Sequence, residues 1–315
     1  MTKSFAIFGR FSYERPLFHH PDSAGKNIVD LNVNFVSENE ALMNIVRNLL
    51  KTGIGHLGLE IHRVPKQLEG SVKIGTLPEK KLDFSRIELI RSSRAEDLRN
   101  ESYVIDLLLE LGINDERLDE FPEHLYPHTG KGVHFWQYPN QFANFLVEIS
   151  KYNICSYAEI GVRHGGTFVI MYEYLKQFNP KFECAMGVDI NESIELTTFA
   201  RARDDIDYLL MSSRSDKFRS KIKNMQFDLA FIDGDHSLVG CKSDFELLKN
   251  QSKMLAFHDI SSTDWPGVCA VWQHFKSVHK EEWDFIEFID QYPDVYTRTG
   301  NSHLGIGLAI KKHVS

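Results

Sequence analysis

Two groups of acidic and histidine residues stand out, because each directly follows an apolar run of strand length. One run ends in Asp233, with Asp235 and His236 just after it, and the next run ends in His258 and Asp259. If both runs are parallel strands, their carboxyl ends lie at the same edge of a sheet, so these side chains should lie together. Carboxylates and imidazoles bind cations and transfer protons. Carboxylates at strand ends also serve as helix caps or as cofactor contacts, and that interpretation stays open.

A glycine-containing loop is the second feature. Glu159 is followed by Gly161 and Gly165, and a helix is predicted to begin directly after the loop. Glycines at this place let a ligand approach the backbone, and the helix N-terminus adds free N–H groups. The spacing differs from G-x-G-x-x-G, the fingerprint of dinucleotide binding. The loop thus points away from a dinucleotide, although an ordinary structural turn explains the glycines equally well.

Further residues would contact the same ligand. Asp189 ends the neighbouring predicted strand, where a carboxylate can accept hydrogen bonds from both hydroxyls of a ribose. It could instead cap the next helix. Ser213 and Asp216 follow a third strand, where either could contact an adenine or form part of a polar loop. Together with the glycine loop, Asp189 predicts an adenosine-containing ligand.

These residues need a parallel sheet to position them, and the pattern of the C-terminal part of the chain predicts one. Apolar runs alternate with helical stretches, which is typical of a parallel sheet covered on both faces. The predicted parallel strands are residues 156–160, 184–188, 206–211, 229–232 and 253–257. Two more strands, 283–288 and 303–309, have no helix-length segment between them and should pair antiparallel. The predicted fold class is α/β, with a Rossmann-like, mostly parallel seven-stranded sheet and an antiparallel last strand.

Residues 1–125 are predicted to form a separate, smaller α+β domain that serves acceptor recognition or oligomerisation. It would contain strands at 4–8, 56–64 and 72–76 and helices at 38–50 and 102–111. Gly53 and Gly55 follow a helix rather than a strand, so we interpret them as a helix stop and turn. A connector at 121–132, with two prolines and two glycines, places the domain boundary between residues 125 and 126. An amphipathic helix at 140–151 then precedes the first strand of the second domain, 126–315.

Composition narrows the class of partner. The 36 Lys and Arg are outnumbered by 44 Asp and Glu, which gives a net charge of -8. No long basic run could follow a phosphate backbone, so nucleic acid is not expected as a partner. No apolar run reaches the length of a membrane helix, and no signal-peptide core is evident near the N-terminus. We expect a cytoplasmic protein without membrane contact that forms a homo-oligomer.

From Trp136 onward the chain closely resembles class I S-adenosylmethionine-dependent methyltransferases. The resemblance is strongest to the family of macrolide-sugar O-methyltransferases, with catechol-type O-methyltransferases and cephalosporin hydroxylase-like proteins as more distant relatives. The matching segments occur in the family's order. They are E-I-G-V-R-H-G-G-T from Glu159, I-D-G-D-H-S from Ile232, F-H-D-I from Phe257 and G-V-x-x-V-W from Gly267.

The resemblance implies that S-adenosylmethionine is the cofactor and that a hydroxyl of a sugar or natural-product small molecule is the acceptor. It implies that Asp233 and Asp259 hold a divalent metal, Mg²⁺, and that His236 is the general base. A sugar hydroxyl is too weakly acidic to ionise at neutral pH, so a cation that lowers its pKa and an imidazole that takes its proton suit the reaction. The predicted cofactor-binding residues are Glu159, Gly161, Gly165, Asp189, Ser213 and Asp233.

Some details depart from the family or stay open. Catechol-type enzymes carry Asp-Asn where this chain has His258-Asp259, so a third metal ligand is not identified. His258 could be a ligand, a second base or a hydrogen-bonded neighbour, and His236 could instead orient Asp233. Three aromatic residues could wall an acceptor pocket or simply be buried near the junction: Trp136, Tyr138 and Trp265. Arg163 and His164 could meet a ligand, although exposure to solvent is the simpler expectation.

Two other functions fit the same sheet. One is an oxidoreductase that uses a nicotinamide cofactor, which the missing G-x-G-x-x-G disfavours. The other is a binding module that keeps the fold and the cofactor pocket without catalysis. The pair of acidic strand ends favours the methyltransferase over both.

Overall fold

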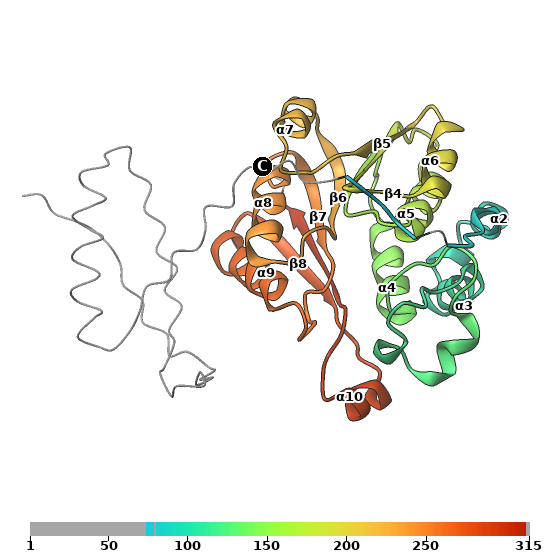
Figure 1. Ribbon diagram of the computed structural model, residues 1–315. Helices are drawn as coiled ribbons and strands as arrows, with labels where there is room; N and C mark the ends of the chain where they lie inside the picture. Colours follow the sequence, from blue (N-terminus) through green and yellow to red (C-terminus); the bar gives the residue numbers. More distant parts are fainter. Residues whose placement is uncertain (1–73, 79, 313–315) are drawn as a thin grey trace, which may run out of the picture. The chain divides into compact units, whose positions relative to one another are not determined.

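The computed structural model describes residues 74–78 and 80–312, which belong to one compact unit (Figure 1). Its centre is a seven-stranded sheet with the strand order β5-β3-β2-β6-β7-β9-β8. The strands are β2 (Ser156–Ile160), β3 (Cys184–Asp189), β5 (Ile206–Leu210), β6 (Phe227–Ile232), β7 (Ser252–Phe257), β8 (Trp283–Phe288) and β9 (Ile306–Lys311). All neighbouring pairs are parallel except those of β9, which runs antiparallel to both β7 and β8. The predicted fold class is confirmed.

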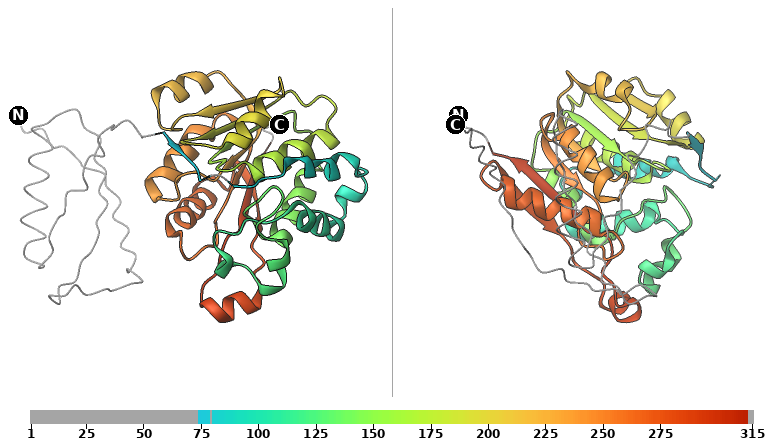
Figure 2. Two further views of the ribbon diagram at one scale, coloured as in Figure 1. Left: turned by 45° about the vertical axis from the view of Figure 1, so that its right-hand side comes forward. Right: turned by 60° about the vertical axis from the view of Figure 1, so that its left-hand side comes forward.

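Helices cover both faces of this sheet (Figures 1 and 2). Side chains alternate along each strand, so Leu229 and Phe231 enter one hydrophobic core and Ala230 and Ile232 enter the other. The first core includes α4 (Pro139–Ile149), α5 (Gly166–Phe178) and α6 (Ile194–Arg201). The second includes α7 (Asp216–Ile222), α8 (Leu238–Leu248) and α9 (Pro266–His279). Burial on both faces explains why the central strands read as nearly continuous apolar runs.

The register of the central strands brings the predicted acidic residues to one edge. Ile160 lies opposite Ile232, and Ile232 lies opposite Phe257, so all three strands end level with one another. Backbone bonds continue past these ends: the N–H of Asp233 donates to the Ile160 carbonyl at 2.8 Å, and that of His258 donates to Ile232 at 3.1 Å. The loops that follow β6 and β7 therefore start side by side from fixed backbone positions.

The segment before α4 packs onto the same face as α4 and α5. Its elements are β1 (Gly75–Thr76), η1 (Phe84–Ile87), α2 (Glu88–Ser92), η2 (Asp97–Arg99), α3 (Glu101–Leu111), η3 (Leu118–Glu120) and η4 (Glu123–His128). Buried Ile90, Leu108 and Phe121 share one core with Phe142 and Tyr157. The predicted boundary between residues 125 and 126 thus does not separate two cores among the described residues. An apolar helix face shows that a segment is buried, but not against which partner.

Most predicted elements of this unit match the structure within a few residues. The helix predicted at 102–111 is α3, which Asn100 caps by accepting a hydrogen bond from the N–H of Tyr103 at 3.0 Å. The short strand β1 covers the end of the prediction at 72–76 and pairs in parallel with β4 (Asn191–Glu192). The predictions at 4–8, 38–50, 53–55 and 56–64 lie outside the described residues. No described helix is both long and apolar enough to span a membrane.

The connection between β8 and β9 differs from the prediction. A short helix, α10 (Pro293–Thr299), lies where no helix was expected, and β9 starts at Ile306 rather than at residue 303. α10 has Pro293 at its start and Gly300 in the left-handed conformation at its end, but only Val295 is buried. With a single buried residue, the helix has no apolar periodicity to reveal it. Leu304 and Gly305 both have positive φ, so extended backbone cannot begin before them.

Candidate active site at the carboxyl edge of the sheet

A cavity of about 500 Å³ opens at the carboxyl edge of the central strands, which is within the usual range for small-molecule sites. Its walls come from the loops after β2, β3, β5, β6 and β7 and from the segment 114–136. The predicted site residues that line it are Glu159, Gly161, Gly165, Asp189, Ser213, Asp233, His236 and Asp259. Residues from five strand ends thus surround one space.

The glycine loop between β2 and α5 is shaped by the two predicted glycines. Gly161 has a φ of 92°, and a Cβ atom there would lie 2.1 Å from the carbonyl oxygen of Asp233. Gly165, with a φ of 94°, forms the N-cap of α5, which has no side-chain cap. The first residues of α5, Gly166 and Thr167, line the cavity, so unpaired N–H groups of a helix N-terminus are available to a ligand.

Asp189 bridges two neighbouring loops instead of capping a helix. Its Oδ2 accepts a hydrogen bond from the N–H of Arg163 at 2.7 Å, and its Oδ1 accepts one from the N–H of Asn191 at 2.7 Å. The N-cap of α6 is Ser193, so the capping interpretation of Asp189 is wrong. Burial raises the pKa of this carboxyl, while the two N–H donors act in the opposite direction. Each oxygen keeps a lone pair that a ribose hydroxyl can use.

Two other predicted cofactor residues are held by buried partners. Glu159 is 1% exposed, accepts a hydrogen bond from the Tyr157 hydroxyl, and has its pKa raised well above the usual value by burial. Ser213 donates to Oδ1 of Asp244 at 2.7 Å, and burial raises the pKa of Asp244 to about 6. Asp216, the alternative to Ser213, is the first residue of α7 and is not part of the cavity wall.

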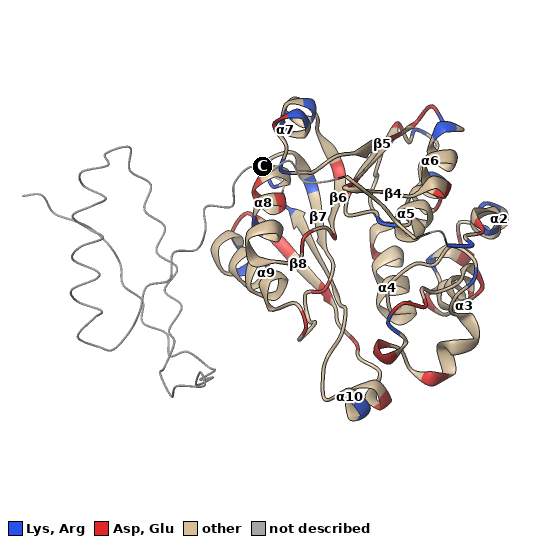
Figure 3. Cartoon of the chain, viewed as in Figure 1, with Lys and Arg blue, Asp and Glu red and all other residues tan. Residues whose placement is uncertain are grey.

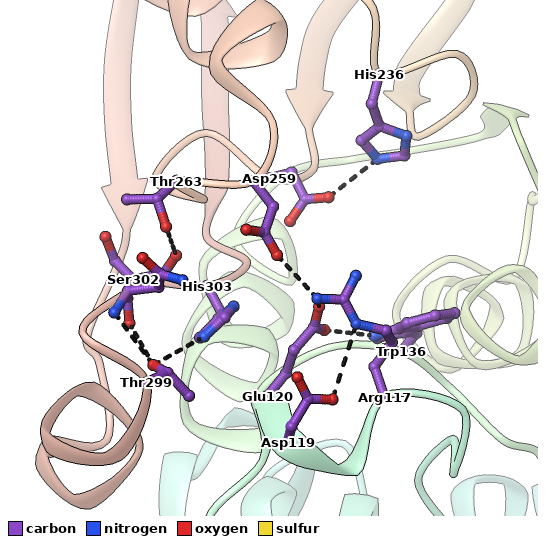
Figure 4. Close-up of polar contacts among 12 residues, drawn as sticks. Arg117, Asp119, Glu120, Trp136, His236, Asp259, Thr263, Thr299, Ser302 and His303 are labelled. Atoms are coloured by element: carbon purple, nitrogen blue, oxygen red, sulfur yellow. Dashed lines mark hydrogen bonds and ion pairs between the residues drawn. The ribbon is translucent and has the colours of Figure 1, made fainter. Parts of the chain in front are cut away.

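The predicted acidic residues meet as an Asp–His cluster of Asp233, His236, His258 and Asp259. His236 Nε2 lies 3.0 Å from Asp259 Oδ2 and 3.3 Å from Asp233 Oδ1. His258 Nδ1 lies 2.8 Å from Asp233 Oδ1 and 3.5 Å from Asp259 Oδ2. Figure 4 shows His236 facing Asp259 from the neighbouring loop. Each histidine therefore faces both carboxylates.

The charges in this cluster are strongly coupled. Burial by itself would raise the pKa of Asp233, but His258 and His236 outweigh it and lower the pKa to about 2. Burial would lower the pKa of His236, but Asp233 and Asp259 outweigh it and raise the pKa to about 10. His236 therefore carries a proton at neutral pH unless another positive charge balances the two carboxylates. The sequence pattern did not predict this charge state.

Two buried atoms of the cluster have no hydrogen-bond partner among the described residues. They are Asp259 Oδ1 and His258 Nε2. Buried polar atoms are normally paired, so such atoms indicate a ligand or an ion. Asp259 also has a φ of 61°, an uncommon conformation that often occurs at functional sites. Oxygen and nitrogen donors that converge in this way suit a divalent cation.

The segment before α4 supplies a side wall that only the structure reveals. We call it the Glu120 wall; it consists of Arg117, Glu120 and Trp136 (Figure 4). Arg117 lies 2.9 Å from Glu120 Oε1 and also donates to Asp264 at 2.9 Å, while Trp136 Nε1 donates to Glu120 Oε2 at 3.2 Å. Glu120 is 5% exposed, and burial raises its pKa to about 7 against the effect of Arg117. Of these residues, only Trp136 was a sequence candidate.

Of the remaining residues that the sequence analysis singled out, some line the cavity and others belong to the hydrophobic core. Trp136 and Trp265 line the cavity, and the Trp265 ring lies 4.9 Å from that of His236. Tyr138 is fully buried, and its hydroxyl donates to the Glu120 carbonyl, so it belongs to the core. Arg163 pairs with a carboxylate of the segment before α4 and lies over the Trp136 ring.

His164, unlike the exposed Arg163, does not face solvent. It is buried, and its Nε2 lies 3.4 Å from Glu116, which is also the partner of Arg163. The expectation of solvent exposure is therefore wrong for His164, whereas the Arg163 side chain is exposed, as expected, although it pairs with Glu116. Both residues connect the glycine loop to the segment before α4.

Glu120 gives a testable pH effect on stability. Its carboxyl titrates near pH 7 in the folded chain, compared with a usual value of 4.5. Between these values only the folded state holds the proton, so the free energy of unfolding falls as pH rises. We expect a fall of roughly 2 kcal/mol between pH 5 and pH 8 from this group. In Glu120→Gln this contribution should vanish, as measured by urea unfolding at both pH values.

The exposed Glu123 offers a matched control. Glu123→Gln should keep the pH dependence of the unchanged protein, because this side chain is exposed in both states. An unaltered pH dependence in Glu120→Gln would show that burial does not perturb this carboxyl.

Comparison with known proteins agrees with this geometry. Residues 158–260 match the family described as a methyltransferase domain. The chain is similar to the solved O-methyltransferase from Bacillus cereus in complex with SAH (S-adenosylhomocysteine). The identity is 12%, the TM-score is 0.41, and 73% of this chain and 96% of that chain are covered. For the plantazolicin methyltransferase BpumL in complex with SAH, the values are 14% identity, a TM-score of 0.37, and coverage of 55% and 82%. No curated protein matches the sequence.

The matched residues run from β2 to the loop after β7, so they include the glycine loop, Asp189 and the Asp–His cluster. The sheet around them is mostly parallel, with β9 inserted antiparallel between β7 and β8. The identification rests on the family match, with which this strand order is compatible. Over residues 158–260 the chain therefore matches a methyltransferase domain.

Proposed function

We propose that the chain is a metal-assisted O-methyltransferase that transfers a methyl group to a hydroxyl of an uncharged sugar or related natural-product small molecule. One observation carries the proposal: the Asp–His cluster, the glycine loop and Asp189, the last two proposed to bind adenosine, line the same cavity. A nucleophile held at the cluster would therefore share one enclosed space with the methyl donor. Such proximity is what a bimolecular transfer requires.

The proposed reaction is an in-line displacement. A lone pair of the acceptor oxygen forms a bond to the methyl carbon, the carbon–sulfur bond breaks, and S-adenosylhomocysteine leaves as a neutral thioether. The sulfonium charge disappears in this step, so the leaving group needs no stabilisation. The acceptor hydroxyl must lose its proton, and the imidazole of His236, which lies at the cavity wall, can accept it when it is neutral.

Asp233 and Asp259 would hold the divalent ion, for which the resemblance implies Mg²⁺. When bound, such an ion lowers the pKa of an acceptor hydroxyl. The residues fit this role, because both carboxylates lie within 3.3 Å of the same atom, His236 Nε2, and Asp259 Oδ1 is buried without a partner among the described residues. His236 acts as a base only where the charge of Asp233 and Asp259 is balanced by something other than its own proton.

The charges of the cavity wall support an uncharged acceptor. Three arginines line the cavity, and each is paired: Arg117 with Glu120, Arg163 with Glu116, and Arg214 with Asp235 at 3.2 Å. Among the described residues, the wall thus offers no unpaired guanidinium to a phosphate or carboxylate. In the view of Figure 3, acidic and basic residues are likewise interspersed over the helices. Strongly anionic acceptors are therefore disfavoured.

The Glu120 wall supports acceptor recognition as the role of the segment before α4. Trp136 contributes a flat ring beside the carboxyl of Glu120, and Trp265 faces the cavity next to His236. Aromatic faces pack against the apolar side of a sugar ring, while carboxyl and guanidinium groups hydrogen-bond to its hydroxyls. This segment lies outside the residues that match the methyltransferase domain.

The cofactor part of the proposal is tested by ligand binding. We expect S-adenosylmethionine and S-adenosylhomocysteine, and not NAD, to raise the melting temperature of the full chain. Asp189→Ala should weaken the binding of S-adenosylhomocysteine by about 10- to 100-fold in calorimetry, since charge-assisted hydrogen bonds to the ribose are lost. The exposed Asp204→Ala is the control and should bind as the unchanged protein does. Stabilisation by NAD alone would overturn the methyltransferase proposal.

The acceptor part is tested by transfer of a labelled methyl group from S-adenosylmethionine. Neutral methyl glycosides should accept the label, and hexuronates and hexose phosphates should accept it more slowly. A preference for the anionic sugars would contradict the inference drawn from the paired arginines.

A further inference from the structure

We propose that His258 is the third protein ligand of the metal, with Asp233 and Asp259, and that the site therefore takes a first-row transition ion in preference to Mg²⁺. The inference rests on the metal-assisted function proposed above and changes the ion that the resemblance implies. It assigns separate tasks to the two histidines of the Asp–His cluster. His258 binds the ion, and His236 takes the proton.

The position of His258 supports this assignment. Its side chain is enclosed, at 6% exposure, and its Nδ1 lies 2.8 Å from Asp233 Oδ1 and 3.5 Å from Asp259 Oδ2. The backbone hydrogen bond to Ile232 holds the residue at the end of β7, level with the end of β6. Donor atoms of Asp233 and His258 belong to a group that lies within 4.8 Å of one another. Asp259 Oδ2, 3.5 Å from His258 Nδ1, lies close enough to bind the same ion at metal–ligand distances of about 2.0 to 2.3 Å.

The donor set argues against Mg²⁺. Mg²⁺ is a hard ion that requires oxygen ligands in nearly ideal octahedral geometry. An imidazole nitrogen suits borderline ions, and affinity for such sites rises from Mn²⁺ through Co²⁺ toward Cu²⁺. Two carboxylates with one buried imidazole therefore match Mn²⁺, Fe²⁺, Co²⁺ or Zn²⁺ better than Mg²⁺. The catechol-type pattern, with Asp-Asn in place of His258-Asp259, would supply oxygen ligands only.

His236 is less suited to be a ligand and better suited to be a base. Its side chain is 21% exposed, compared with 6% for His258, and it belongs to the loop after β6. It packs against Trp265, which is 38% exposed and lines the cavity. An imidazole at the open side of the cluster can exchange its proton with an acceptor or with water, which an enclosed ligand cannot do.

A second group of possible ligands, Glu120, Asp264 and His303, does not compete for the ion. The guanidinium of Arg117 lies 2.9 Å from Glu120 (Figure 4) and also 2.9 Å from Asp264. These carboxylates already have a cation between them, so a metal would have to displace a fixed charge. The Asp–His cluster has no Lys or Arg pairing with its members among the described residues.

Spectroscopy of the Mn²⁺-loaded full chain tests the assignment directly. Electron spin echo modulation should show ¹⁴N coupling from a bound imidazole in the unchanged protein. The coupling should be lost in His258→Gln and retained in His236→Gln. In calorimetry, the unchanged protein should bind Mn²⁺ at least about tenfold more tightly than Mg²⁺, and His258→Gln should remove most of this preference.

Three results would overturn the proposal: no ¹⁴N coupling in the unchanged protein, loss of the coupling in His236→Gln instead of His258→Gln, or equal affinity for Mn²⁺ and Mg²⁺. If His258→Gln fails to fold, His236→Gln decides the question, because a ¹⁴N coupling retained in that variant cannot come from His236. Binding of S-adenosylhomocysteine, measured on the same samples, separates the two claims. If S-adenosylhomocysteine does not bind, the proposed function is contradicted. The ¹⁴N signal concerns only the ligands of the ion.

Discussion

Replacing His236 by glutamine should lower kcat for methyl transfer to a neutral glycoside by about 10²- to 10⁴-fold, the usual contribution of a general base. Glutamine fills a similar volume and can hydrogen-bond to Asp233 and Asp259, but it cannot take a proton at neutral pH. Binding of S-adenosylhomocysteine should stay nearly unchanged, because His236 lies on the loop after β6 and Asp189 lies at the end of β3. Initial rates at saturating cofactor, together with calorimetry, measure both quantities.

The pH profile distinguishes a base from a positioning residue. If His236 takes the proton, kcat of the unchanged protein rises with pH as the imidazole becomes neutral, and His236→Gln loses that rise. If His236 only orients Asp233, the variant keeps the same rise at a lower rate. The matched control is His274→Gln on α9, which is exposed and outside the cavity wall. Full activity in His236→Gln would show that another group accepts the proton.

Replacing Gly161 by alanine should destabilise the fold by about 3 to 5 kcal/mol and abolish cofactor binding. Alanine at a φ of 92° adopts a conformation that costs about 1 to 2 kcal/mol. Its Cβ would also lie 2.1 Å from the Asp233 carbonyl oxygen and 2.6 Å from Gly234 Cα. These are backbone atoms at the end of β6, so relief of the clash must move Asp233 away from the cluster. Thermal and urea unfolding measure the loss.

Gly300 supplies the control for the conformational part of this effect. It has a φ of 71°, and a Cβ atom there would meet nothing within 4 Å. Gly300→Ala should therefore lose only about 1 kcal/mol and keep full cofactor affinity. The difference between the two variants isolates the clash with the Asp233 backbone. Equal losses in the two would mean that the loop after β6 can shift without cost.

The sheet and the place of the site could be predicted because their signals are local. Apolar runs separated by helical stretches indicate parallel strands, and the carboxyl ends of parallel strands meet at one edge. Asp189, Asp233 and Asp259 could thus be assigned to one cavity before any coordinates were known. The glycine loop could be predicted as well, because its glycines stand directly between a predicted strand and a predicted helix.

Contacts between segments that are distant in the chain could not be predicted from the sequence. Arg117 and Glu120 belong to short polar elements, and nothing in their local pattern shows that they approach Asp264, about 150 positions later in the chain. The helix at 102–111 was predicted, but not that α3 belongs to the core of α4 and α5, and α2 was not predicted at all. The helix α10 was not predicted from the sequence, because seven residues with one buried side chain show no apolar periodicity.

The sequence by itself determined the fold class, the glycine loop and the edge at which Asp233, His236, His258 and Asp259 gather. Only the tertiary structure decided what those residues do to one another. The pKa of about 10 for His236 arises from two carboxylates on different strands, and the approach of His258 to Asp233 depends on the register of β6 and β7. Charge coupling falls off over a few ångströms, so the chemistry of the site follows from distances in space that spacing along the chain does not specify.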